Sequence, residues 1–346
     1  MQNGKPKFSL PGYVIILLII FLLSACTSDS TISNTGVSSP TPSIEPTLTA
    51  TPEPLGSPGN PLVLGVMLED ELGDKNAYQQ LVDQLSLLTD MNFKYQLFTT
   101  WDDLDVAIKS HSVQISFLPP LTYLHARDLN LVRVGLLTNH YGVYYYGTQI
   151  LANIESGFIA YFDPVSNQTT GDAATALAQF QDRRPCWIEP SSLAGYYYPS
   201  GLLLENNVIV KEPAFIQSNT GAIRALYIKG ICDFAATFAI SGDPRTSSSV
   251  MDDLPDIMNR VVVIWRSDPV IPNLNVSYDI SLTNDMVSTI STAFTDMVDT
   301  QEGQLILSSA LNYDIQDLRV VDDSIYNALR RTLQFTDINF STTLGR

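Results

Sequence analysis

Basic residues, histidines and cysteines are scarce in this chain of 346 residues. Lys and Arg number 19 against 36 Asp and Glu, which gives a net charge of −17 at pH 7. Such an acidic protein lacks the basic surface that attracts nucleic acid, so nucleic acid is not expected as a partner. The histidines His111, His125 and His140 have no metal-ligand spacing with the cysteines. We therefore expect no metal site and no cofactor.

An apolar run long enough for a permanent membrane helix is also missing. The run Tyr13–Leu23 is about half of the roughly 20 residues needed to span a bilayer. It follows Lys5 and Lys7 and ends in small residues, which is typical of a secretory signal. Residues 1–25 are therefore predicted to be a signal peptide that is removed on export.

The end of this signal, Leu23-Ser24-Ala25-Cys26, resembles the lipobox of bacterial lipoproteins. The resemblance implies that Cys26 becomes the new N-terminus and carries acyl chains, which would hold the protein outside the cytoplasm on a bacterial membrane. Ordinary cleavage beside an incidental cysteine is the alternative. Residues 26–60 are rich in Ser, Thr and Pro and nearly free of apolar residues, so they are predicted to form a disordered tether.

Cys186 and Cys232 remain as a pair once Cys26 is lipidated. Because an exported protein folds in an oxidising compartment, we predict a disulfide between them. Two buried free thiols are the alternative.

Beyond the tether, short apolar runs alternate with helical patterns, which is typical of βαβ units and predicts a parallel sheet. Strands are predicted at 61–68, 93–98, 113–118, 186–188, 231–236 and 261–265. Helices are predicted over residues that include 81–88, and at 101–110, 121–127, 172–180, 195–204, 222–228, 286–298, 302–311 and 322–333. We expect two α/β lobes, one from residues 62–147 plus 272–346 and the other from 148–271, with a ligand cleft between them.

Two segments carry polar groups just before predicted helices. The first contains Ser191 and Ser192, followed by Leu193 and Ala194, and the second contains Thr220. Free N–H groups in a first helical turn can bind an oxyanion, although a hydroxyl there can equally serve as a helix cap. Trp101 and Tyr123 begin helices near strand ends of the first lobe, where aromatic rings could flank a small ligand.

Four segments in this order resemble one known family. They are Phe117–Tyr123, the turn Glu189–Tyr196, Val263–Ser267 and Ile271-Pro272-Asn273. The chain is similar to the phosphate-, phosphite- and phosphonate-binding proteins of ABC importers over roughly residues 62–340. That resemblance implies the type II periplasmic binding protein fold, with two hinged lobes and a ligand cleft. It also implies that Trp101 replaces an aromatic ligand contact that is usually tyrosine, and that Tyr123 and Ser192 match two further contacts.

Departures from the family pattern affect the ligand. The family turn Ser-Thr-Ser-Gly is Ser192-Leu193-Ala194-Gly195 here, so two hydroxyls are lost while the backbone amides remain. A histidine-aspartate pair becomes Thr220-Gly221, and an acidic residue that meets a ligand amine falls near Thr237 or Phe238. A bulkier or more apolar phosphonate, or another oxyanion, is therefore a possible ligand.

The sequence thus predicts a monomeric solute-binding lipoprotein that captures an oxyanion for the permease subunits of an ABC importer. A binding protein that signals occupancy to a membrane partner is the second hypothesis. An enzyme on the same fold is the third; it would use Cys186 with a distant histidine, but no local motif supports that pair.

Overall fold

Two mixed β-sheets organise the chain in the computed structural model, which describes residues 53–68 and 75–338. The order of strands in the first sheet is β14 (Asp317–Val320), β4 (Val132–Asn139), β13 (Asn275–Asp279), β3 (Ile115–Leu118), β1 (Leu62–Met67) and β2 (Phe93–Phe98). The order in the second is β11 (Val261–Arg266), β5 (Tyr145–Asn153), β10 (Phe234–Ala239), β8 (Pro185–Trp187) and β9 (Ala214–Phe215), with β12 (Ile271–Pro272) paired to β5. A separate small hairpin joins β6 (Phe162–Asp163) and β7 (Gln168–Thr169).

The prediction of a parallel sheet is correct only for part of each sheet. β1 pairs in parallel with β2 and β3, and β8 pairs in parallel with β9 and β10. By contrast, β13 runs antiparallel to β3 and β4, and β5 runs antiparallel to β10 and β11. The chain enters the second sheet at β5 and returns to the first at β13, and the alternation of strands and helices along the sequence does not reveal these antiparallel pairings.

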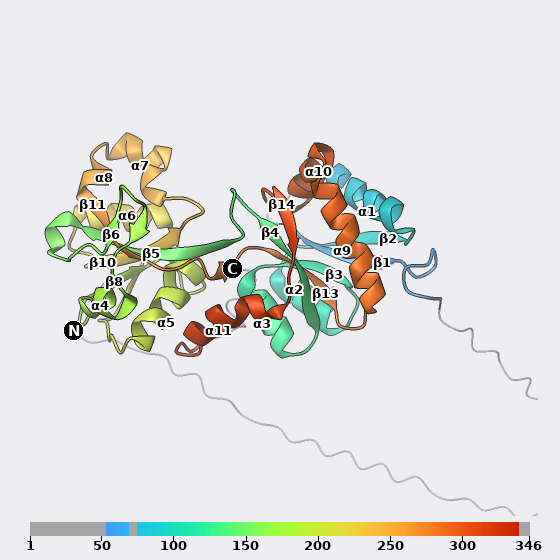
Figure 1. Cartoon of the computed structure of the whole chain (residues 1–346), viewed down its shortest axis with the longest axis horizontal. Coiled ribbons are helices and arrows are strands. Elements are labelled where there is room, and N and C mark those ends of the chain that lie inside the picture. The colour runs from blue at the N-terminus through green and yellow to red at the C-terminus, as the bar shows by residue number, and fades with distance from the viewer. Residues whose placement is uncertain (1–52, 69–74, 339–346) are drawn as a thin grey trace, which may run out of the picture. The chain divides into compact units, whose positions relative to one another are not determined.

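Helices cover both sheets. The first sheet is accompanied by α1 (Lys75–Thr89), α2 (Trp101–Lys109), α3 (Pro120–Asp128), α9 (Asn284–Val298) and α10 (Gln301–Leu311). The second is accompanied by α4 (Ala173–Ala178), α5 (Tyr198–Glu205), α6 (Asn219–Ile228), α7 (Ser248–Asp253) and α8 (Ile257–Arg260). Figure 1 shows α1, α9 and α10 packed together beside the first sheet. Among the described residues, no helix has the length and apolar character required to cross a bilayer.

Burial of apolar side chains explains why these helices form where they do. On α1, Leu81, Val82 and Leu85 recur at helical spacing and are almost completely buried against the first sheet. Leu88, three residues after Leu85, is 44% exposed, so the buried face of α1 ends one turn before the helix does.

The last helix, α11 (Asn327–Leu333), contacts elements beside both sheets. It follows the short 3₁₀ turn η4 (Asp323–Tyr326), whose Tyr326 ring lies 4.4 Å from the ring of Tyr123 on α3. It also packs on α5, where Thr332 Oγ1 donates to Glu205 Oε2 at 3.3 Å. The C-terminal residues, which the sequence places in the first predicted lobe, therefore bind part of the second as well (Figure 1).

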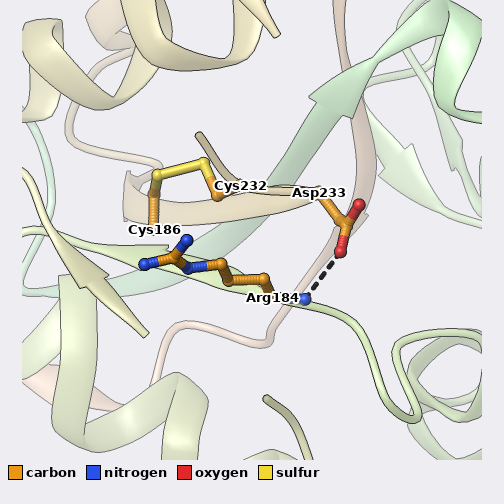
Figure 2. Close-up of a disulfide and its surroundings, with 4 residues drawn as sticks. All are labelled: Arg184, Cys186, Cys232 and Asp233. Atoms are coloured by element: carbon orange, nitrogen blue, oxygen red, sulfur yellow. Dashed lines mark hydrogen bonds between the residues drawn. A yellow bond between two sulfur atoms is a disulfide. The ribbon is translucent and has the colours of Figure 1, made fainter. Parts of the chain in front are cut away.

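The predicted disulfide between Cys186 and Cys232 is confirmed, with the two Cα atoms 5.6 Å apart. It joins Cys186 in β8 to Cys232, which lies two residues before the parallel neighbour β10. Figure 2 shows the bridge beside Arg184 and Asp233, where the Arg184 backbone N–H donates to Asp233 Oδ2 at 2.7 Å. The bridge and this hydrogen bond together hold one end of the two strands.

The predicted signal peptide, Cys26 and most of the predicted tether lie outside the described residues, as does much of the loop after β1. The last residues of the predicted tether do have structure. Gly56 N–H donates to Asn60 O at 2.7 Å, and Asn92 N–H donates to Gly56 O at 2.8 Å. The folded body therefore begins before residue 61, the boundary predicted from composition.

Candidate ligand-binding site

A cavity of about 980 Å³ lies where segments from the two sheets meet. Its lining residues are mostly aromatic, apolar or small: Met67, Trp101, Phe117, Pro119, Pro120, His140, Tyr141, Tyr146, Phe238, Ser241, Gly242, Asp243, Pro244, Thr246, Ser247, Asn273, Leu274, Leu311 and Tyr313. A cavity of this size is at the upper end of the range of roughly 300–1,000 Å³ that is typical of small-molecule sites.

The first sheet contributes the carboxyl ends of two parallel strands. Met67 ends β1, and Phe117 lies near the end of β3, just before the prolines that begin α3. Trp101 is the first residue of α2, where the side chain of Thr100 caps the helix by accepting from Asp103 N–H at 3.1 Å. The cap fixes the entry into α2 and so holds the indole at the cavity.

The second sheet contributes Tyr146 from β5, Phe238 from β10 and the loop 241–247 that follows β10. This loop begins after Ile240, which has φ of 80°. A β-branched residue is strained in that region of backbone conformation, and such strain persists only where the surrounding structure imposes it. The turn into the loop is therefore held in place by its neighbours.

Two segments that pass between the sheets form the remaining wall, and they bind each other. Asn273 N–H donates to Tyr144 O at 3.0 Å, and Asn273 Nδ2 donates to Val143 O at 2.7 Å. Nearby, the His140 ring stacks on the Tyr313 ring with centroids 3.9 Å apart, and His140 Nδ1 lies 2.7 Å from Asp314 O. Because a carbonyl can only accept, Nδ1 carries a hydrogen and donates it to Asp314 O.

The electrostatics of the lining are close to neutral. Among the residues that the structure describes, it contains no Lys or Arg and one carboxylate, Asp243, which accepts from Arg245 Nη2 at 2.6 Å. Burial acts to raise the pKa of Asp243, but the hydrogen bonds and charge of Arg245 outweigh burial and hold this pKa below its ordinary value. The carboxylate therefore stays ionised, and its charge is balanced inside the protein.

Tyrosines near the cavity stay protonated at neutral pH. Burial raises the pKa of Tyr146 well above its ordinary value, and none of the described residues forms a hydrogen bond with its hydroxyl. Burial also raises the pKa of Tyr313 to about 12, despite a hydrogen bond to Thr138. Both hydroxyls keep their hydrogens, and that of Tyr146 is available to a ligand.

Of the seven predicted ligand residues, Trp101 lines this cavity and the other six do not. Ser192 caps the short π-helical segment η2 (Leu193–Tyr197) by accepting from Gly195 N–H at 3.1 Å, which is the alternative role considered for it. Ser191, Leu193 and Ala194 are buried, and Ala194 O accepts from Thr148 Oγ1 at 2.7 Å. The structure therefore gives this turn a role in packing, and its role in ligand binding stays a prediction.

The second predicted oxyanion seat has a different cap from the one expected. Ser218, not Thr220, caps α6, because its side chain accepts from Gly221 N–H at 3.0 Å. Thr220 is the second residue of the helix and is half-buried. The earlier position of the cap means that α6 begins three residues before the predicted start.

Tyr123 is fully buried and belongs to an ionic cluster. Its hydroxyl donates to Asp323 Oδ1 at 2.6 Å, and the same carboxylate accepts from Arg330 Nη1 and Nη2, each at 2.9 Å. Arg127 adds an ion pair at 3.7 Å. These contacts join α3 to η4 and α11, so the hydroxyl is engaged in holding the C-terminal helix.

The substitution Asp323→Asn should lower the free energy of unfolding at pH 7 by about 1 kcal/mol, because it removes the charge that strengthens the hydrogen bonds from Arg330 and Tyr123. The expected loss is small because solvent screens a partly exposed carboxylate. Burial acts to raise the pKa of Asp323, yet the hydrogen bonds from Arg330 and Tyr123 outweigh it and lower this pKa. The stability that ionised Asp323 contributes is therefore fully present above the pKa of this carboxyl in the unfolded chain, about 3.9. It is lost as pH falls through the lower pKa of Asp323 in the folded protein.

Thermal unfolding of both proteins at pH 7, 5 and 3 checks this expectation. The difference between them should be similar at pH 7 and 5 and should shrink by pH 3. The exposed carboxylate Asp252 provides the control, because Asp252→Asn removes the same charge without removing such contacts. A difference that persists unchanged at pH 3 would contradict the role given to the ionised carboxylate.

Sequence reasoning missed most of the lining, including Tyr146, the loop 241–247 and Tyr313. One detectable signal was the turn-like sequence Ser241-Gly242-Asp243-Pro244 after an apolar run. The strand before it is predicted at 231–236, which separates this turn from the end of the strand. In the structure the strand is β10, Phe234–Ala239, and it ends just before the turn. The correct strand end places this loop at the carboxyl end of a strand, where ligand sites are expected.

Comparison with known proteins shows which family the chain resembles in sequence. Residues 69–326 match the family model for the periplasmic substrate-binding protein of the phosphonate ABC transporter. No curated protein sequence matches the chain significantly.

Solved structures show the same fold at low sequence identity. XAC2383 from Xanthomonas citri bound to chloride ion is 13% identical, with a TM-score of 0.59 and coverage of 79% of this chain and 96% of that one. Its complex with ATP gives 12% identity, a TM-score of 0.58 and the same coverage. PhnD1 from Prochlorococcus marinus in complex with methylphosphonate is 12% identical, with a TM-score of 0.50 and coverage of 79% and 97%. These similarities confirm the predicted type II periplasmic binding protein fold.

Proposed function

Because this chain belongs to the family of ABC transporter phosphonate periplasmic substrate-binding proteins, we propose that it captures a phosphonate or related oxyanion in the cavity lined by Trp101. The family is one of extracytoplasmic transport proteins and not of enzymes. The observation that carries the proposal is the position of the cavity, which combines the carboxyl ends of β1 and β3 with β5, β10 and the loop after β10. Support for a phosphonate also comes from the methylphosphonate held by PhnD1.

Capture by closure of two lobes is the mechanism we propose. The lobes are residues 62–147 plus 272–346 and residues 148–271, and the paired segments around Val143 and Asn273 are the hinge. A ligand that contacts both lobes stabilises the closed state by the contacts that only this state provides. Permease subunits of an importer would then recognise the closed form.

Attachment to the membrane is the second part of the proposal. The lipobox-like sequence ending at Cys26 supports a lipid anchor, and the Ser, Thr and Pro residues after it support an extended tether. The anchored protein would act as a monomer on the outer side of the membrane. An enzyme that uses Cys186 as a nucleophile is disfavoured, because the disulfide leaves no thiol at this position.

Calorimetric titration of the chain without residues 1–26 tests the function. We expect saturable heat with at least one of methylphosphonate, larger phosphonates, phosphite and phosphate. Trp101→Ala should weaken that binding about tenfold and Trp101→Phe less, because the second variant keeps an aromatic face. Val165→Ala, at a position 94% exposed, is the control. Absence of heat across the whole panel would contradict the proposed function.

A further inference from the structure

The cavity is much larger than an inorganic oxyanion or a one-carbon phosphonate requires. Its volume of about 980 Å³ compares with roughly 30 Å³ for one water molecule in the liquid. A tetrahedral oxyanion occupies the space of a few waters, so most of the cavity would remain outside its contacts. The present volume leaves room for a ligand that has a body as well as a charged group, although the proposed closure of the lobes would reduce it.

The walls indicate what kind of body fits. Trp101 and Phe117 come from the first-sheet side, whereas Tyr146 and Phe238 come from the second. Tyr313 adds a ring already stacked on His140. Aromatic faces on both sides of a cavity bind planar apolar groups by burial and by ring stacking.

The charges of the lining do not select for a small anion. The one carboxylate among the described lining residues is balanced by Arg245, whose side chain is only 9% exposed, and these residues include no Lys or Arg to attract an oxyanion. Contact with the rings must therefore supply a large share of the affinity.

Polar groups on the lining residues are few and separate. Among the residues that the structure describes, none bonds to the Tyr146 hydroxyl, the Trp101 indole N–H or His140 Nε2. A hydroxyl, an indole N–H and an imidazole nitrogen set among aromatic side chains resemble the fixed polar points by which apolar sites orient a ligand.

We propose that the ligand of this cavity carries a planar ring, as in an aryl or heteroaryl phosphonate or phosphate ester, and that the ring packs among Trp101, Tyr146 and Phe238. This inference rests on the proposed function and narrows its ligand class.

A matched pair of ligands tests the inference on the full-length chain in lipid nanodiscs, with empty nanodiscs as the blank. Methylphosphonate and benzylphosphonate share a head group and differ in the ring. Benzylphosphonate should bind at least tenfold more tightly by calorimetry. Phe238→Ala should reduce this ratio severalfold and Phe238→Leu, which keeps apolar volume without a ring, should reduce it less.

Each outcome has a separate meaning. Equal affinities, or tighter binding of methylphosphonate, would overturn the ring inference while leaving oxyanion capture intact. If neither phosphonate binds, the ring inference fails, and the proposed function fails as well only when phosphite and phosphate also give no heat. The control Val165→Ala should keep the wild-type ratio, and thermal unfolding of each variant shows whether it has folded.

Discussion

Replacing both Cys186 and Cys232 with alanine should lower the free energy of unfolding by about 4 kcal/mol. In the chain-entropy model the stabilisation grows with the loop that the bridge closes, and here the two cysteines are 46 residues apart. That loop contains the residues of η2, α5, β9 and α6. In the unfolded chain, the bridge therefore restricts the conformations of a long segment of the second sheet's side of the protein. A loss of this size should lower the melting temperature by roughly 10 °C.

Differential scanning calorimetry with and without reductant measures this effect. Reductant should lower the melting temperature of the wild type and leave the double variant unchanged, which makes the variant its own control. Access for the reductant is through Cys232, since Cys186 is completely buried. Equal melting temperatures for the oxidised wild type and the double variant would show that the bridge contributes little.

Gly303→Ala should also destabilise the protein, by about 2 kcal/mol, although alanine ordinarily favours a helix by about 1 kcal/mol over glycine. Gly303 lies in the first turn of α10, and a Cβ atom there would come within 2.0 Å of Met297 O. That oxygen already accepts from Thr300 N–H at 3.1 Å and from Thr300 Oγ1 at 3.0 Å. Backbone atoms must move to admit the methyl group, so the overpacking cost exceeds the helix gain.

The control is Ser309→Ala, which places the same residue at an exposed position of the same helix. Chemical denaturation should show a change within about 0.5 kcal/mol for Ser309→Ala, in contrast to the clear loss for Gly303→Ala. A Gly303→Ala protein as stable as the wild type would mean that the turn between α9 and α10 relaxes more easily than its contacts indicate.

Much of the secondary structure could be predicted because it depends on local patterns. The strand at Phe93–Phe98 was predicted with its observed bounds, and α2 and α10 were placed within one residue. β4 was not predicted, and β10 was placed about three residues too early. Short apolar runs of this kind are ambiguous, because their state is decided by which strands pair beside them.

The candidate site was harder to predict than the fold. Trp101 could be found because it begins a helix shortly after a predicted strand, which is a local signal. Tyr146 and Phe238 look like ordinary strand residues in the sequence, since nothing local distinguishes a ring facing a cavity from one in the core. Tyr123 has the opposite outcome. Its position at the start of a helix predicted a ligand contact, but its hydroxyl donates to Asp323.

The sequence by itself determined the family, the fold class and the disulfide, since each follows from residues in a fixed order or from a simple pairing in an exported protein. The tertiary structure decided which strands run antiparallel, where the cavity lies and what lines it. These features bring together residues far apart in the chain, such as Trp101 and Phe238, and the free energy of such contacts depends on packing that no local pattern records.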